Sequence, residues 1–146
     1  MSMLERLGLA EGTRGLIIHA DDSGMCHGAN VATRDALNSG AVNSTAVMVP
    51  CPWFPEFAGM CREHPEWDVG VHLTHTAEWT EYRWGPVLSA TDVPGLVDDE
   101  GYLWRQGRGV TENATADEIE RESRAQIDRA IEFGIRPTHI DTHMGV

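Results

Sequence analysis

The chain has 146 residues, of which 23 are acidic and 11 are basic, so its formal net charge is −12 at pH 7. This length fits one ordinary domain with a buried core. The negative balance argues against nucleic acid and anionic membranes as partners, because both bind clusters of Lys and Arg. No stretch approaches the roughly 20 apolar residues of a membrane span, and the first residues lack the apolar segment of a signal peptide. We therefore expect a cytoplasmic protein that does not contact a membrane.

The first predicted element is a buried strand over residues 16–20, which stops on two adjacent carboxylates, Asp21 and Asp22. Neighbouring side chains on a strand alternate between faces, so we expect that both carboxylates cannot point into the sheet. Burial of two unpaired acids is also very costly. A divalent cation is the simplest acceptor for them, and capping of the next helix is the alternative.

Alternating helices and strands follow. Asn30 is the predicted N-cap of a helix that ends at Gly40. A β-branched and apolar stretch predicts a strand over residues 41–49, and Pro55 suits the first position of a short helix. Residues 67–73 predict a third strand, which also finishes on a potential ligand, His72.

Residues 74–110 form a long segment without periodicity, which we expect to be a functional or mobile loop. Its aromatic residues are Trp79, Tyr82, Trp84, Tyr102 and Trp104. Aromatic side chains on such a loop suit the apolar faces of sugar rings. The alternative is that they pin the loop to the body of the protein.

The last part of the chain predicts a helix and a strand. Thr115 and Glu118 have the spacing of a capping box, and Gly134 ends the helix. The residues expected on its core face are Ile119, Ile127, Ala130 and Ile131. If residues 138–143 form a strand, then His139, Asp141 and His143 share one face, as in a binding site rather than a core.

The alternation of strands and helices predicts an α/β fold of parallel βα units. Asp22, His72 and His143 each lie at or just after the end of a different predicted strand, and the carboxyl ends of parallel strands meet at one rim. One carboxylate and two imidazoles with open positions are typical of a hydrolytic metal site. The three side chains are therefore predicted to share one cation.

Other chemistry has weaker support. The sequence contains no dinucleotide-binding glycine motif, no phosphate-binding loop and no serine-hydrolase elbow. Cys26 precedes His27, but sequence neighbours rarely present a nucleophile and its base to each other. Three widely spaced cysteines, Cys26, Cys51 and Cys61, also argue against a disulfide framework, so we expect buried thiols.

Four segments, residues 18–24, 40–45, 70–74 and 137–143, resemble the successive motifs of the YdjC-like carbohydrate deacetylases. The resemblance implies a parallel (β/α) barrel of the polysaccharide-deacetylase type, of which residues 1–146 would form about the N-terminal half as one partial domain. It also implies a divalent metal, Mg²⁺ or Zn²⁺, and hydrolysis of an N-acetyl group from an amino sugar or oligosaccharide. Ser23 departs from the family pattern, which usually has an aromatic residue there.

On the matching positions, the resemblance implies that Asp22, His72 and His143 bind the metal and that Asp21 is the catalytic base. Further candidates, expected to orient a ligand or to contact substrate, are His139, Asp141, His75 and Trp84. An open sheet edge predicts a homo-oligomer or an incomplete fold. Alternative functions are a non-catalytic carbohydrate- or metal-binding module, an interaction protein, and another metal-dependent amide or ester hydrolase on the same fold.

Overall fold

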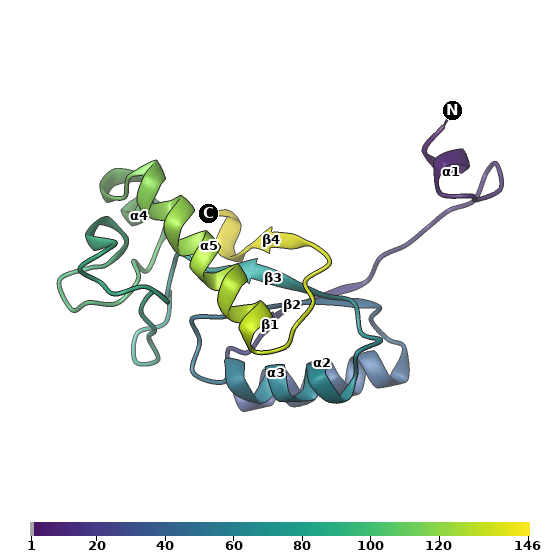
Figure 1. Cartoon of the computed structure of the whole chain (residues 1–146), viewed down its shortest axis with the longest axis horizontal. Helices are drawn as coiled ribbons and strands as arrows, with labels where there is room; N and C mark the ends of the chain where they lie inside the picture. The colour runs from purple at the N-terminus through teal and green to yellow at the C-terminus, as the bar shows by residue number, and fades with distance from the viewer. Residues whose placement is uncertain (1) are drawn as a thin grey trace.

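The computed structural model describes residues 2–146, which contain a four-stranded sheet with the order β1-β2-β3-β4 and parallel neighbours throughout (Figure 1). The strands are β1 (His19–Ser23), β2 (Ser44–Val47), β3 (Val69–Leu73) and β4 (Ile140–Thr142). The helices are α1 (Met3–Arg6), α2 (His27–Ser39), α3 (Phe54–Glu63), α4 (Gly107–Asn113) and α5 (Ala116–Glu132), with 3₁₀ turns η1 (Pro94–Leu96) and η2 (His143–Gly145). Among these residues, no helix combines the length and apolar character needed to cross a membrane.

The core lies between the sheet and the helices α3 and α5. Val69, Val71 and Leu73 of β3 belong to it, together with Phe57 of α3 and Ala130 of α5. Because successive side chains on a strand point to opposite faces, the other residues of β3 face away from this core. The sheet therefore has one apolar face covered by helices and one face free for polar side chains, on which His72 lies.

A bulge interrupts β1 at the two acidic residues. Ala20 pairs with Thr45 and Ser23 pairs with Val47, so β1 carries one residue more than β2 between these points. Asp22 adopts a left-handed conformation with φ 61°, which costs about 1 kcal/mol for a residue other than glycine. The bulge breaks the strict alternation of side chains. The alternation from which we expected that Asp21 and Asp22 cannot both point into the sheet therefore does not hold here. Asp21 contacts His19 and Asp22 contacts His72, and both of these histidines contact Asp141.

Buried hydroxyl groups hold this bulge. Ser23 is fully buried, and its Oγ lies 2.8 Å from Oγ1 of Thr45. Thr45 donates its hydroxyl hydrogen to the carbonyl of Ala20 at 2.7 Å. Ser23 thus places a hydroxyl group inside the strand, where it forms a hydrogen bond beside the bulge.

Two predicted boundaries near the N-terminus are wrong. Strand β1 begins at His19 rather than at residue 16, and the side chains of Leu16 and Ile17 are 75% and 77% exposed. Pairing with β2 starts only at His19, and the preceding segment leads away from the sheet towards α1 (Figure 1). Helix α2 begins one turn earlier than predicted, because Cys26 Sγ accepts a hydrogen bond from Ala29 N at 3.4 Å.

Asn30 therefore lies inside α2, where it is fully buried. Its Oδ1 accepts a hydrogen bond from Gly24 N at 2.6 Å, and its Nδ2 donates to Glu56 at 2.7 Å. This side chain joins the loop after β1 to helices α2 and α3. The predicted end of α2 is confirmed, with Gly40 in the left-handed conformation at φ 74°.

The predicted capping box of α5 is confirmed, but its core face is only partly as expected. Ile131 is 54% exposed, whereas Glu122 and Gln126 are fully buried. The Glu122 carboxylate accepts hydrogen bonds from two backbone N–H groups, those of Val87 and Leu88, and burial raises its pKa. The core face of α5 therefore includes two polar side chains that the expected apolar set did not contain, and tertiary hydrogen bonds hold them there.

Residues 74–110 are packed rather than structureless. Gln126 binds both the N–H and the C=O of Thr74, at 2.9 and 2.8 Å. The segment contains η1 and the start of α4, and together with residues that follow β2 it forms a second, smaller core. The buried residues of that core are Met48, Cys51, Ala77, Trp84, Val93, Leu96, Leu103 and Val110.

We predict that Gly24→Ala destabilises the fold more than Gly40→Ala. Both glycines have positive φ, but a Cβ at Gly24 would lie 3.0 Å from a methyl group of Val47, whereas nothing lies within 4 Å at Gly40. Gly40→Ala should cost about 1 kcal/mol, the strain of the backbone alone, and Gly24→Ala about 2 kcal/mol or more because crowding adds to it. Urea unfolding measures both values, and equal losses would contradict the crowding at the end of β1.

Candidate metal centre

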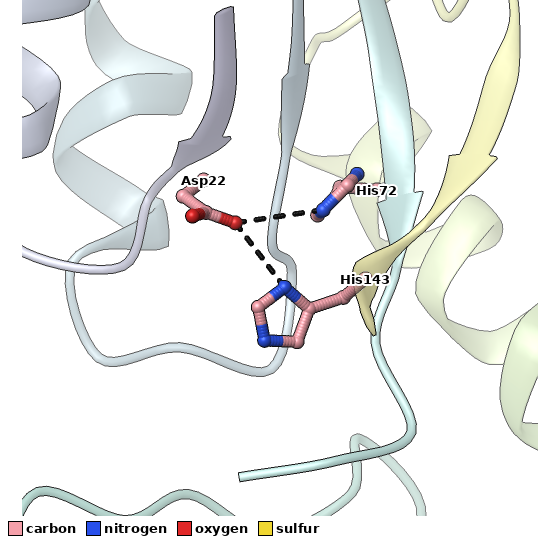
Figure 2. A group of neighbouring side chains, drawn as sticks. All are labelled: Asp22, His72 and His143. Carbon is pink, nitrogen blue, oxygen red and sulfur yellow. Dashed lines mark ion pairs between the residues drawn. The ribbon is translucent and has the colours of Figure 1, made fainter. Parts of the chain in front are cut away.

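Asp22, His72 and His143 come together at the carboxyl ends of the strands (Figure 2). Asp22 lies in the bulge of β1, His72 on β3, and His143 directly after β4. Oδ1 of Asp22 is 3.2 Å from Nδ1 of His143 and 3.5 Å from Nε2 of His72. One ligand atom from each side chain lies within 4.8 Å of the other two. The structure thus brings together the three residues that the sequence placed around one cation.

The electrostatics of the group favour an ionised Asp22. Contact with the imidazole of His143 lowers the pKa of the Asp22 carboxyl, although burial acts in the opposite direction. Burial would lower the pKa of His143, but the two carboxylates beside it, Asp22 and Glu78, outweigh burial and raise it. The group therefore consists of one half-buried carboxylate and two buried imidazoles.

Each imidazole is held at its other nitrogen by a second carboxylate. Nδ1 of His72 lies 2.7 Å from Oδ1 of Asp141, and Nε2 of His143 lies 3.0 Å from Oε2 of Glu78. Such contacts fix the tautomer of a histidine and the direction of its free lone pair. Asp141 was a sequence candidate. Glu78 was missed, because it lies in the segment without periodicity, 65 residues from His143.

These side chains fit a divalent cation. Oδ1 of Asp22 is buried and has no hydrogen-bond partner, although two imidazole nitrogens face it. Ligand atoms around a tetrahedral cation with bonds of about 2.1 Å lie about 3.4 Å apart, and the two separations at Asp22 are 3.2 and 3.5 Å. The orphaned oxygen and the spacing indicate a place for a cation among the three groups.

A second group adjoins the first. Nε2 of His19 lies 3.3 Å from carboxylate oxygens of both Asp21 and Asp141. Asp141 therefore uses one oxygen for His72 and the other for His19. The Asp21 side chain is 59% exposed, so it is open to solvent beside the buried group. His139 packs its ring edge-on against His19, with centroids 5.2 Å apart, rather than against His72 or His143.

Trp84 and His75 occupy different surroundings. Trp84 is 3% exposed, donates its indole N–H to the carbonyl of Thr76 at 2.9 Å, and has its ring centroid 6.4 Å from that of His143. Trp84 is therefore part of the core and contacts His143 from there. His75 is buried, and its Nε2 lies 3.1 Å from Oγ of Ser123, so its side chain contacts helix α5.

The cysteines do not form a catalytic pair with His27. Nδ1 of His27 contacts Glu56 at 2.8 Å, whereas Sγ of Cys26 caps α2. Cys51 and Cys61 are buried free thiols, as predicted, and Cys26 is half-buried. Burial raises the pKa of the Cys61 thiol to about 12.

The fold and the site define the class as an α/β protein with a parallel sheet and an Asp-His-His group at the carboxyl edge of that sheet. The sequence profile of the YdjC-like protein family matches residues 15–146. The chain belongs to this family.

Curated relatives carry the name "Carbohydrate deacetylase". The one from Brevibacillus brevis is 40% identical over 128 residues, covering 88% of this chain and 48% of the relative. The one from Thermus thermophilus is 38% identical over 145 residues, covering 99% and 49%. A crystal structure from Enterococcus faecalis V583, named "putative cellobiose-phosphate cleavage protein", matches with TM-score 0.80 and 36% identity over 89% of this chain and 48% of that one. The chain spans about half the length of these relatives.

We predict that Trp84→Ala lowers the free energy of unfolding by about 3–5 kcal/mol, the usual cost of removing a buried aromatic side chain. The matched control is Trp79→Ala on the same segment. Trp79 is 51% exposed, so its removal should change stability by no more than about 0.5 kcal/mol. Urea unfolding of both variants measures the difference. If Trp84→Ala lowers the free energy of unfolding by less than about 1 kcal/mol, Trp84 is not a core residue and is again a candidate for substrate contact.

Proposed function

We propose that this chain carries the centre of a metal-dependent hydrolase that removes an N-acetyl group from an amino sugar or oligosaccharide. The observation that carries the proposal is the meeting of Asp22, His72 and His143, with ligand atoms within 4.8 Å of one another, at the carboxyl edge of the sheet. The names of the relatives from Brevibacillus brevis and Thermus thermophilus support the carbohydrate substrate and the deacetylation.

Each residue has a role in this proposal. Asp22 Oδ1, His72 Nε2 and His143 Nδ1 would hold Zn²⁺ or Mg²⁺. The chemistry that such a cation supplies when bound is Lewis acidity, which lowers the pKa of water and polarises a carbonyl oxygen. Asp21, exposed beside this group, takes the proton of the attacking water on its carboxylate. His19, 3.3 Å from Asp21, holds that carboxylate in place.

Metal binding and acetate release test the proposal. We expect the chain, stripped with a chelator, to bind one Zn²⁺ or Mg²⁺ by titration calorimetry and to release acetate from N-acetylated chitobiose or N-acetylglucosamine. Asp22→Ala and His143→Ala each remove a ligand. They should weaken metal binding by more than the roughly 10–100-fold that loss of an outer partner costs.

The variant Asp21→Asn tests the role of the proposed base separately from the roles of the metal ligands. It should bind metal within a few-fold of the parent and lower the rate of acetate release roughly 10²–10⁴-fold, the usual contribution of a general base. Asp99→Asn, an exposed carboxylate on the 74–110 segment, is the matched control and should leave both measurements unchanged. Parental metal affinity in Asp22→Ala, or a parental rate in Asp21→Asn, would refute the corresponding assignment.

The name of the Enterococcus faecalis neighbour favours a second candidate, cleavage of a phosphorylated disaccharide. Such a reaction would break a glycosidic bond and release a reducing sugar instead of acetate. Cellobiose 6-phosphate is therefore included in the same assay. Glucose release without acetate release would favour this candidate.

We also propose that the four strands are part of a (β/α) barrel and that the chain associates with a second copy. The edge strands support this, because Ile140 on β4 is 58% exposed and the apolar residues before β1 are exposed as well. Open sheet edges tend to pair with further strands. Sedimentation equilibrium at micromolar concentration should give at least twice the monomer mass of 16.1 kDa. A monomer throughout that range would contradict the association.

A further inference from the structure

Glu78 has a position that no sequence pattern indicated. Its Oε2 lies 3.0 Å from Nε2 of His143, and the opposite nitrogen of the same ring, Nδ1, lies 3.2 Å from Oδ1 of Asp22. A neutral imidazole carries one hydrogen, which can reside on either nitrogen. Two carboxylates on opposite sides of one ring therefore compete for that hydrogen.

The backbone around Glu78 is fixed by buried contacts. The N–H of Ala77 donates to the carbonyl of Trp104 at 2.8 Å, and the indole of Trp84 donates to the carbonyl of Thr76 at 2.9 Å. Ala77 is fully buried, and the Glu78 side chain is only 29% exposed. Glu78 is therefore a carboxylate aimed at His143 by a packed segment, in contrast to a mobile surface acid.

We propose that Glu78 is a positioning residue of the metal centre. By accepting the Nε2–H hydrogen of His143, it leaves the lone pair of Nδ1 directed at Asp22 and at the cation that the proposed function places there. The proposal rests on that function for the presence of the cation. It makes residues 74–110 part of the metal centre, because the segment supplies the group that selects the tautomer of His143.

Loss of Glu78 has a specific consequence. Without it, Asp22 is the carboxylate that remains in contact with the ring, and it draws the hydrogen to Nδ1, the nitrogen that must be free to bind metal. Carboxylates that orient metal-binding histidines typically contribute 10–100-fold to metal affinity. Asp141 stands in the same relation to His72, so both imidazoles of the group share this arrangement.

Zn²⁺ affinity of the full chain, measured by titration calorimetry, tests the proposal. Glu78→Ala should weaken binding about 10–100-fold. Glu78→Gln keeps an acceptor oxygen but loses the charge, so it should weaken binding less than Glu78→Ala. The matched controls are Glu81→Ala and Glu81→Gln, which remove the same charge from an exposed position of the same segment and should bind as the parent does.

The tautomer of His143 gives a readout that is independent of activity and of metal. Long-range ¹H–¹⁵N spectra of the metal-free chain, at a pH where the ring is neutral, should show the hydrogen on Nε2 in the parent. In Glu78→Ala they should show a substantial population with the hydrogen on Nδ1. The Glu81 variants should keep the parental tautomer.

The outcomes separate this proposal from the proposed function. If the parent binds Zn²⁺ and Glu78→Ala binds it within twofold with the parental tautomer, the role of Glu78 is refuted while the metal centre stands. Equal losses in the Glu78 and Glu81 variants would also refute it, because a general charge effect would explain them. If the parent takes up neither Zn²⁺ nor Mg²⁺, the metal centre and the role of Glu78 fail together.

Discussion

The bulge at the end of β1 is the constraint on which the site depends. A regular strand would turn Asp21 and Asp22 to opposite faces, and only one could meet the histidines of β3 and of the segment after β4. The left-handed conformation of Asp22, φ 61°, brings its carboxylate to them. The cost of this conformation is of the order of 1 kcal/mol, and the buried hydroxyl contact between Ser23 and Thr45 helps to offset it.

The two faces of the sheet have different roles, because one packs into the core and the other carries the site residues. Val69, Val71 and Leu73 pack against helices, whereas His72, between two of them, joins the carboxylates on the other face. In the parallel register His72 of β3 pairs with Asp141 of β4, so both side chains lie on the face that carries the site. Core packing therefore fixes the positions of the site residues without enclosing them in apolar surroundings.

Buried polar side chains of α5 hold the segment 74–110 beside the site. Glu122 and Gln126 bind backbone groups of this segment, and the segment in turn places Glu78 against His143. Hydrogen bonds in a buried setting are directional and costly to leave unmade. They hold a long segment with little regular secondary structure in one position, next to the side chains of the candidate metal centre.

The sequence by itself determined the order of the strands and helices, the capping box at Thr115, and the candidates Asp22, His72 and His143. The periodicity of apolar residues and the position of a residue at the end of a strand are local signals. They were enough to group the candidates, because parallel strands bring their carboxyl ends to one rim. The start of β1, the burial of Glu122 and the contact of Glu78 with His143 were decided only by the tertiary structure. Each depends on a partner far along the chain, 65 residues away for Glu78, and no local pattern encodes a hydrogen bond over that separation.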